Sequence, residues 1–149
     1  MKKHFLCAPL LLSLLLLLTG CAKAPEPVEI AATTLPVYEF TQALCRGTDL
    51  SVGRLVTESV SCLHDYSLNV NQVRLAEQAE ALVLSGAGLE DFMEDVLQAS
   101  QDTIECADGV ALLPGEDGEA DPHIWLDPSR AAQMVQNSSI PFTPVRSSS

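Results

Sequence analysis

The chain has 149 residues, which is enough for one domain of ordinary size and too few for two. Acidic side chains outnumber basic ones by 20 to 8, and the formal net charge is −12 at pH 7, which argues against a nucleic-acid partner because phosphate contacts need clustered Lys and Arg. The 47% hydrophobic content excludes wholesale disorder, and the absence of any repeat excludes collagen and coiled coil.

The N-terminus predicts export and attachment to a membrane. A short basic start precedes the apolar run Phe5–Leu18, which is shorter than the ~20 residues that a spanning helix needs and suits the core of a signal peptide. The run leads into Leu18-Thr19-Gly20-Cys21, which resembles the lipobox of bacterial lipoproteins. We therefore expect residues 1–20 to be a lipoprotein signal peptide and Cys21 to carry the lipid. Residues 21–27 would then tether the protein to the bacterial cell membrane, outside the cytoplasm.

Predicted strands alternate with predicted helices after the tether. In chain order these are a strand at 28–32, a turn and helix at 33–46, a strand at 50–56, a helix at 69–79, a strand at 81–85, a helix at 89–97, a strand at 103–106, and a last helix that opens with Asp127 as N-cap and Pro128 in its first turn. Such alternation predicts an α/β fold with a mainly parallel sheet flanked by helices.

Periodicity predicts which helix faces are buried. Five apolar residues of the helix at 89–97 lie three and four positions apart, namely Leu89, Phe92, Met93, Val96 and Leu97. The helix at 33–46 is expected to bury Val37, Phe40 and Leu44. A Gly- and acid-rich loop is predicted at 108–121. The stretch 137–149 has no core-building period, so we expect the folded lobe at 28–136 to be followed by an atypical, disordered tail.

Two histidines, His64 and His123, follow the signal peptide, and each lies in a predicted loop beside an aspartate. Because the carboxyl ends of parallel strands meet at one edge of a sheet, we expect both imidazoles at that edge, near Thr33-Thr34 and Gly86. Two neutral imidazoles on an acidic rim would form half of a divalent-metal site. From spacing alone, a surface or helix-capping role for each histidine stays open.

The sequence around His123 resembles a known family. Residues 121–128, DPHIWLDP, closely resemble a signature of the ABC-transporter substrate-binding lipoproteins that capture zinc or manganese. Residues 62–66, with His64, stand where this family carries its first metal histidine. The segment 82–97, LVLSGAGLEDFMEDVL, is similar to its strand–glycine–helix segment, and 30–40 to its first strand and helix. The resemblance covers residues 28 to about 136.

The resemblance implies a two-lobed receptor that holds Zn²⁺ or Mn²⁺ in its cleft and delivers the ion to an ABC permease. His64 and His123 match the two metal ligands of the N-terminal lobe. The C-terminal lobe, which supplies the other two ligands, is absent, and the helix from Pro128 resembles the start of the connecting helix; the chain is therefore expected to be a truncated form. Zinc is favoured over manganese, although the loop 114–120 lacks the histidines that zinc-binding members often carry.

Two other classes of function are an enzyme and a surface-interaction protein. An enzyme is not expected, because Ser85-Gly86-Ala87-Gly88 supplies only part of a dinucleotide-binding fingerprint and no catalytic constellation is present. The alternative to a metal receptor is a surface adhesion or interaction lipoprotein with vestigial metal binding. The sequence leaves open which two of Cys45, Cys62 and Cys106, if any, form a disulfide.

Overall fold

The computed structural model describes residues 26–58, 63, 66–99, 102–115 and 118–139. Their centre is a sheet of four parallel strands in the order β2-β1-β3-β4. The strands are β1 (Ile30–Ala32), β2 (Val52–Arg54), β3 (Ala81–Leu84) and β4 (Thr103–Glu105). Each lies within a segment that the sequence predicted as a strand, and helices flank the sheet. The predicted α/β fold is therefore confirmed.

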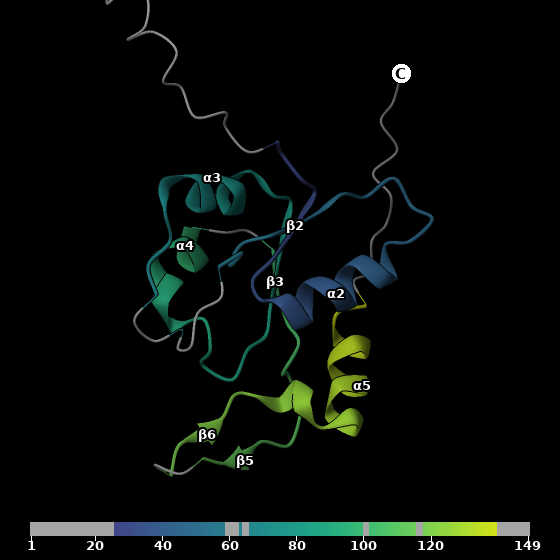
Figure 1. Cartoon of the computed structure of the whole chain (residues 1–149), viewed down its shortest axis with the longest axis vertical. Helices are drawn as coiled ribbons and strands as arrows, with labels where there is room; N and C mark the ends of the chain where they lie inside the picture. The colour runs from purple at the N-terminus through teal and green to yellow at the C-terminus, as the bar shows by residue number, and fades with distance from the viewer. Residues whose placement is uncertain (1–25, 59–62, 64–65, 100–101, 116–117, 140–149) are drawn as a thin grey trace, which may run out of the picture.

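Different helices cover the two faces of the sheet (Figure 1). The four α-helices in the described residues are α2 (Leu35–Leu44), α3 (Val70–Gln78), α4 (Glu94–Ala99) and α5 (Pro128–Asn137). One face packs against α2 and α5 through Val37 and Met134. The other face packs against α3 through Ala76, and Met93, just before α4, joins the same cluster. The protein thus has three layers, with the sheet in the middle.

The central strands are buried on both faces because they carry apolar residues at every position. In β1, Ile30 and Ala32 belong to the α2–α5 side, whereas Ala31 belongs to the α3–α4 side. In β3, Val83 and Leu82 divide in the same way, and both are essentially inaccessible to solvent. A strand that alternates between two apolar layers reads as a continuous apolar run, as expected for a parallel sheet.

Local capping residues set the starts of α3 and α5. Asn69 Oδ1 accepts hydrogen bonds from the backbone N–H groups of Asn71 (2.9 Å) and Gln72 (3.1 Å), and Gln72 Oε1 accepts from Asn69 N (2.8 Å). This reciprocal capping box pairs backbone donors that have no partner within the helix. In α5, Asp127 Oδ1 accepts from Ser129 N (2.8 Å), which confirms Asp127 as the N-cap.

The prediction of a helix at 89–97 is wrong for the first half of that segment. The structure has a turn at Leu89 and Glu90, a 3₁₀-helix η1 (Asp91–Met93), and then the short α4. The physical reason is that the Glu90 side chain turns back to accept hydrogen bonds from the backbone N–H groups that precede it, so a regular helix does not begin there. Leu89 and Met93 are nevertheless buried, as the periodicity predicted.

Two other local predictions also need correction. Leu44 is 41% exposed, and Thr41 is buried on α2 in its place, because its hydroxyl hydrogen-bonds to Val37 O (2.8 Å) and is thereby satisfied. The predicted loop at 108–121 contains a short antiparallel pair, β5 (Leu113–Pro114) and β6 (Ala120–Asp121).

The lobe extends past the boundary predicted at residue 136. Asn137 is the last residue of α5, and its side-chain amide donates to the backbone oxygens of Cys106 (2.8 Å) and Asp108 (2.7 Å). Ser138 is buried, and its hydroxyl donates to Met134 O (2.7 Å). Short polar side chains can close a helix in this way, so their presence did not signal disorder here.

Several predicted features lie outside the described residues. These are the signal peptide, the lipidation residue Cys21, the metal-ligand candidate His64, the thiol of Cys62, and the part of the predicted tail at 140–149. Within the described part of the chain, Cys45 and Cys106 form no disulfide. None of the helices in the described part of the chain is long and apolar enough to cross a membrane.

We expect Asn69→Ala to lower the free energy of unfolding by about 1 kcal/mol, because it removes the side-chain acceptor at the start of α3. Asn71→Ala is the matched control, since it makes the same chemical change within the first turn at an exposed position. Urea unfolding followed by circular dichroism compares the two variants with the wild type. Equal losses of stability in both variants would contradict the capping role of Asn69.

Candidate metal site

The described half of the candidate site is built around His123, which lies between β6 and the 3₁₀-helix η2 (Ile124–Leu126). Asp121 Oδ1 is 2.8 Å from His123 Nδ1 and also accepts a hydrogen bond from His123 N (2.9 Å). One carboxylate oxygen therefore holds both the backbone and the ring of the histidine. With Nδ1 directed to Asp121, Nε2 is the ring nitrogen left for a ligand.

The electrostatics of this pair suit a metal-binding imidazole. The backbone hydrogen bond from His123, and then its ring, hold the pKa of Asp121 below its ordinary value, so the carboxylate is ionised at neutral pH. Metal-binding histidines commonly direct their other ring nitrogen to a carboxylate, which fixes the tautomer and the orientation of the ring. The His123 side chain is 57% exposed, so an ion from solvent can reach it. The Trp125 ring lies beside it, with the ring centroids 5.3 Å apart.

His123 and Asp121 line an open cavity of about 590 Å³. The same cavity is lined by Ala87, Gly88 and Asp91, which belong to the segment that follows β3. The structure therefore places His123 across a cavity from the turn at the carboxyl end of β3. In the described part of the chain, no three His, Cys, Asp or Glu side chains gather closely enough to hold a metal ion by themselves.

The second candidate ligand, His64, lies outside the described residues, but both ends of its loop are described. The Tyr66 hydroxyl hydrogen-bonds to Glu58 Oε2 (2.5 Å) and accepts a hydrogen bond from Gln72 Nε2 (2.6 Å). Gln72 Nε2 also donates to Leu55 O (2.8 Å), just after β2. The end of β2, the return of the loop and the start of α3 are therefore held together.

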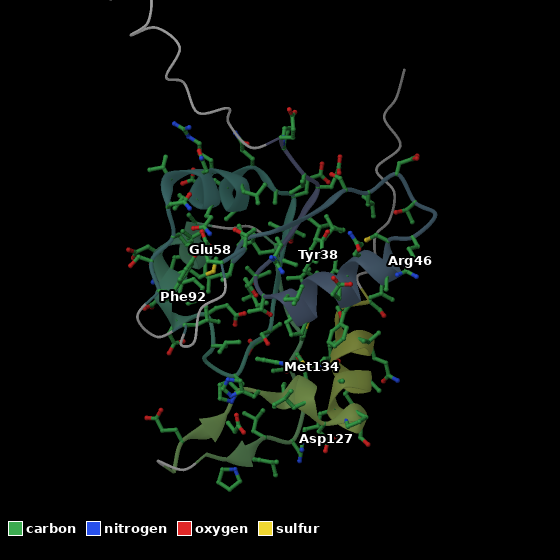
Figure 2. All side chains as sticks on the ribbon, in the orientation of Figure 1. Tyr38, Arg46, Glu58, Phe92, Asp127 and Met134 are labelled. Atoms are coloured by element: carbon green, nitrogen blue, oxygen red, sulfur yellow. The ribbon has the colours of Figure 1, made fainter. Side chains whose placement is uncertain are left out.

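An aromatic contact supports this arrangement from the α4 side. The Tyr66 ring meets the Phe92 ring edge to face, with the centroids 5.4 Å apart. Glu58 and Phe92 lie on the side of the sheet that α3 and α4 cover (Figure 2). The spacing of Asn69 and Gln72 could have revealed the capping box from sequence alone, but the contacts of Gln72 with Tyr66 and Leu55 could not.

Glu90 is the polar residue at this edge of the sheet that the sequence reasoning missed. It is only 4% exposed, although the acidic residues that follow it in the sequence, Asp91, Glu94 and Asp95, are exposed. Its carboxylate accepts from Thr33 Oγ1 (2.6 Å), Ser85 N (2.8 Å) and Gly86 N (2.9 Å). Burial raises the pKa of Glu90, whereas these three donors oppose the rise. The carboxylate joins the carboxyl ends of β1 and β3, where the strand order reverses and ligands bind in open α/β sheets.

The segment that contains the sheet and His123 matches a known family. Residues 30–139 match the family described as ZnuA, the periplasmic zinc-uptake complex component A. A curated relative, the zinc-binding lipoprotein AdcA of Streptococcus pneumoniae, is 29% identical over 143 residues, which cover 82% of this chain and 28% of that protein. The chain therefore spans little more than a quarter of the length of this relative.

Solved structures show the same fold. Zn(II)-bound AdcA from Streptococcus pneumoniae superposes with a TM-score of 0.63 and 28% identity, covering 76% of this chain and 25% of that one. An Mn-bound periplasmic metal-binding protein from Candidatus Liberibacter asiaticus gives a TM-score of 0.65 at 20% identity, covering 76% and 43% of the two chains. At that identity the second likeness concerns the fold alone.

The burial of Glu90 predicts a specific pH dependence of stability. Because burial raises its folded-state pKa above the ordinary 4.5, the stability that this group contributes is complete below that pH and is lost as the pH rises through the raised pKa. We therefore expect the free energy of unfolding of the wild type to fall over this range relative to Glu90→Gln, which does not titrate. Glu39→Gln, on the exposed side of α2, is the control. Urea unfolding at several pH values tests this, and parallel curves for the wild type and Glu90→Gln would contradict it.

Proposed function

Because the chain belongs to the ZnuA family of periplasmic zinc-uptake components, we propose that it captures a divalent metal ion, zinc in preference to manganese, outside the cytoplasm. The observation that carries the proposal is the His123 imidazole, anchored by the Asp121 carboxylate at the rim of the cavity. Membership of a family of metal-binding uptake receptors also confirms the prediction that the chain is not an enzyme.

Capture of a metal ion at this site requires correctly placed ligands and a favourable electrostatic field, and no covalent bond is made or broken. The cavity is rimmed by the acidic side chains of Asp91, Glu119 and Asp121, and the whole chain carries a net charge of −12. A negative field of this kind raises the local concentration of cations. A neutral imidazole then replaces water in the coordination shell, and because a protonated imidazole cannot bind, capture weakens as the pH falls.

His64 and His123 are the proposed protein ligands from this lobe. Two imidazole nitrogens favour zinc over manganese, because Mn²⁺ prefers oxygen ligands. The hydrogen bonds among Glu58, Tyr66 and Gln72 support this assignment, since they hold the ends of the His64 loop at the carboxyl end of β2. Water or groups outside this lobe would complete the coordination shell, and an ion held by only two protein ligands is expected to bind weakly.

Lipid attachment and delivery to an ABC permease complete the proposal. We assign residues 1–20 to a signal peptide, Cys21 to lipidation and residues 21–27 to a tether that keeps the lobe at the cell membrane. The naming of the relative AdcA as a zinc-binding lipoprotein supports this assignment. Because the chain spans about a quarter of that relative, handover to a permease is proposed for the receptor as a whole.

Removal of either candidate ligand tests metal capture directly. We expect His123→Ala and His64→Ala each to weaken Zn²⁺ binding at least tenfold, because each removes one of the two proposed coordinating nitrogens. Isothermal titration of the full chain with Zn²⁺ measures the change. Glu39→Ala, on the exposed side of α2, is the control and should bind as the wild type does. Zinc binding that is indifferent to both histidines would contradict the proposal and favour the surface-interaction role.

The carboxylate that anchors His123 gives an independent test. We expect Asp121→Asn to weaken Zn²⁺ binding by about 10- to 100-fold, since it removes the charge that orients and polarises the imidazole. Asp108→Asn makes the same change in net charge at an exposed position that does not line the cavity. Equal affinities in the two variants would show that net charge, and not the Asp121–His123 contact, governs binding.

A further inference from the structure

The turn that faces His123 has an unusual backbone. Gly86, Ala87 and Gly88 have φ values of +86°, +57° and +80°, so three consecutive residues lie in the left-handed region. Ala87 is the only non-glycine residue with a positive φ in the described part of the chain. A residue with a Cβ atom adopts this conformation only at a cost in free energy, so surrounding contacts must hold the turn in place.

Two carboxylates supply those contacts. Glu90 accepts from the backbone N–H groups of Ser85 (2.8 Å) and Gly86 (2.9 Å), and Glu105 Oε1 accepts from Ala87 N (3.2 Å). Three successive backbone donors of the turn are therefore bound by side-chain acceptors. Glu90 is in turn tied to the end of β1 by the hydroxyl of Thr33 (2.6 Å).

The turn packs so closely against its neighbours that Gly86 cannot be replaced by a residue with a side chain. A Cβ atom at Gly86 would lie 2.5 Å from Glu105 Cγ and 2.8 Å from Ala107 Cβ, so the backbone of the turn lies directly against β4 and the residues after it. A Cβ atom at Gly88, by contrast, would make only an ordinary van der Waals contact, at 3.8 Å from a carboxylate oxygen of Asp91. Ala87 and Gly88 form part of the wall of the cavity that also contains His123 and Asp121. The conformation of the turn therefore sets the shape of the cavity opposite His123.

We infer that Glu90 is a positioning residue for metal capture, which acts by holding the left-handed Gly86–Gly88 turn as the wall opposite His123. This inference rests on the proposed function, because the metal enters the cavity that the turn shapes. Both oxygens of Glu90 accept hydrogen bonds from backbone N–H groups, so the carboxylate cannot be replaced by an amide without loss. In Glu90→Gln, one backbone donor would face the side-chain NH₂ group, which is itself a donor.

The test compares Glu90→Gln with Glu39→Gln, which makes the same change in charge on the exposed side of α2. In a Zn²⁺ titration of the full chain, we expect about tenfold weaker binding for Glu90→Gln, which is within the range lost when supporting carboxylates around metal sites are removed. Binding by Glu39→Gln should be unchanged. Hydrogen exchange of the amides of residues 85–87 should accelerate in Glu90→Gln alone. The His123–Asp121 side of the cavity should keep its exchange rates.

A second-site rescue separates positioning from general stability. Ala87→Gly removes the steric penalty of a positive φ, so the double variant Glu90→Gln with Ala87→Gly should recover part of the lost Zn²⁺ affinity. If Glu90→Gln does not fold, Gly88→Ala strains the same turn without a steric clash and should also weaken Zn²⁺ binding. Gly109→Ala is its control, because Gly109 has φ +67° and open space but does not line the cavity.

The outcomes distinguish this inference from the proposed function. Wild-type affinity in Glu90→Gln and in Gly88→Ala, while His123→Ala abolishes binding, would overturn the positioning role and leave metal capture intact. Absence of Zn²⁺ binding by the wild-type chain would overturn both. Weaker binding in Glu90→Gln, together with faster exchange of the turn and recovery by Ala87→Gly, is the result that supports the inference.

Discussion

One buried carboxylate joins the two central strands at the point where they end. Glu90 takes a hydrogen bond from Thr33 after β1 and two from the backbone after β3. A charge removed from water is costly unless several donors surround it, so the chain must present those donors in a fixed geometry. That requirement dictates the path of the Gly86–Gly88 turn, delays the start of α4, and shapes the cavity that faces His123.

The order of the strands explains why this position matters. β1 lies between β2 and β3, so the chain leaves β1 toward one side of the sheet and later returns to its other side. The loops that follow β1 and β3 separate at this point and leave a crevice. Glu90 occupies the inner part of that edge, and the His123 cavity opens beyond the turn that Glu90 holds. A structural carboxylate and a candidate metal site thus share one edge of the sheet.

Predictions from sequence succeeded where the physical cause is local. The central strands β1 and β3 have apolar residues at successive positions, and Asn69 and Asp127 cap their helices through groups two and three residues away. The predictions failed where a hydrogen bond made by a polar side chain decides whether a residue is buried or where a helix starts. Thr41 is buried because its hydroxyl finds Val37 O, and the helix at 89–97 starts late because Glu90 turns back toward β3. The spacing of apolar residues along the sequence carries no information about such side-chain hydrogen bonds.

The sequence by itself determined the layered α/β fold, the family signature at 121–128 and the position of an aspartate beside His123 in a loop, since each depends on residue types and short spacings. Only the tertiary structure decided that Gly88 lines the same cavity as His123, and that Glu90, alone among neighbouring acids, is buried. The reason is physical. Residues far apart in the chain meet only after the strands have paired, and the desolvation of a charge depends on which donors that pairing brings to it.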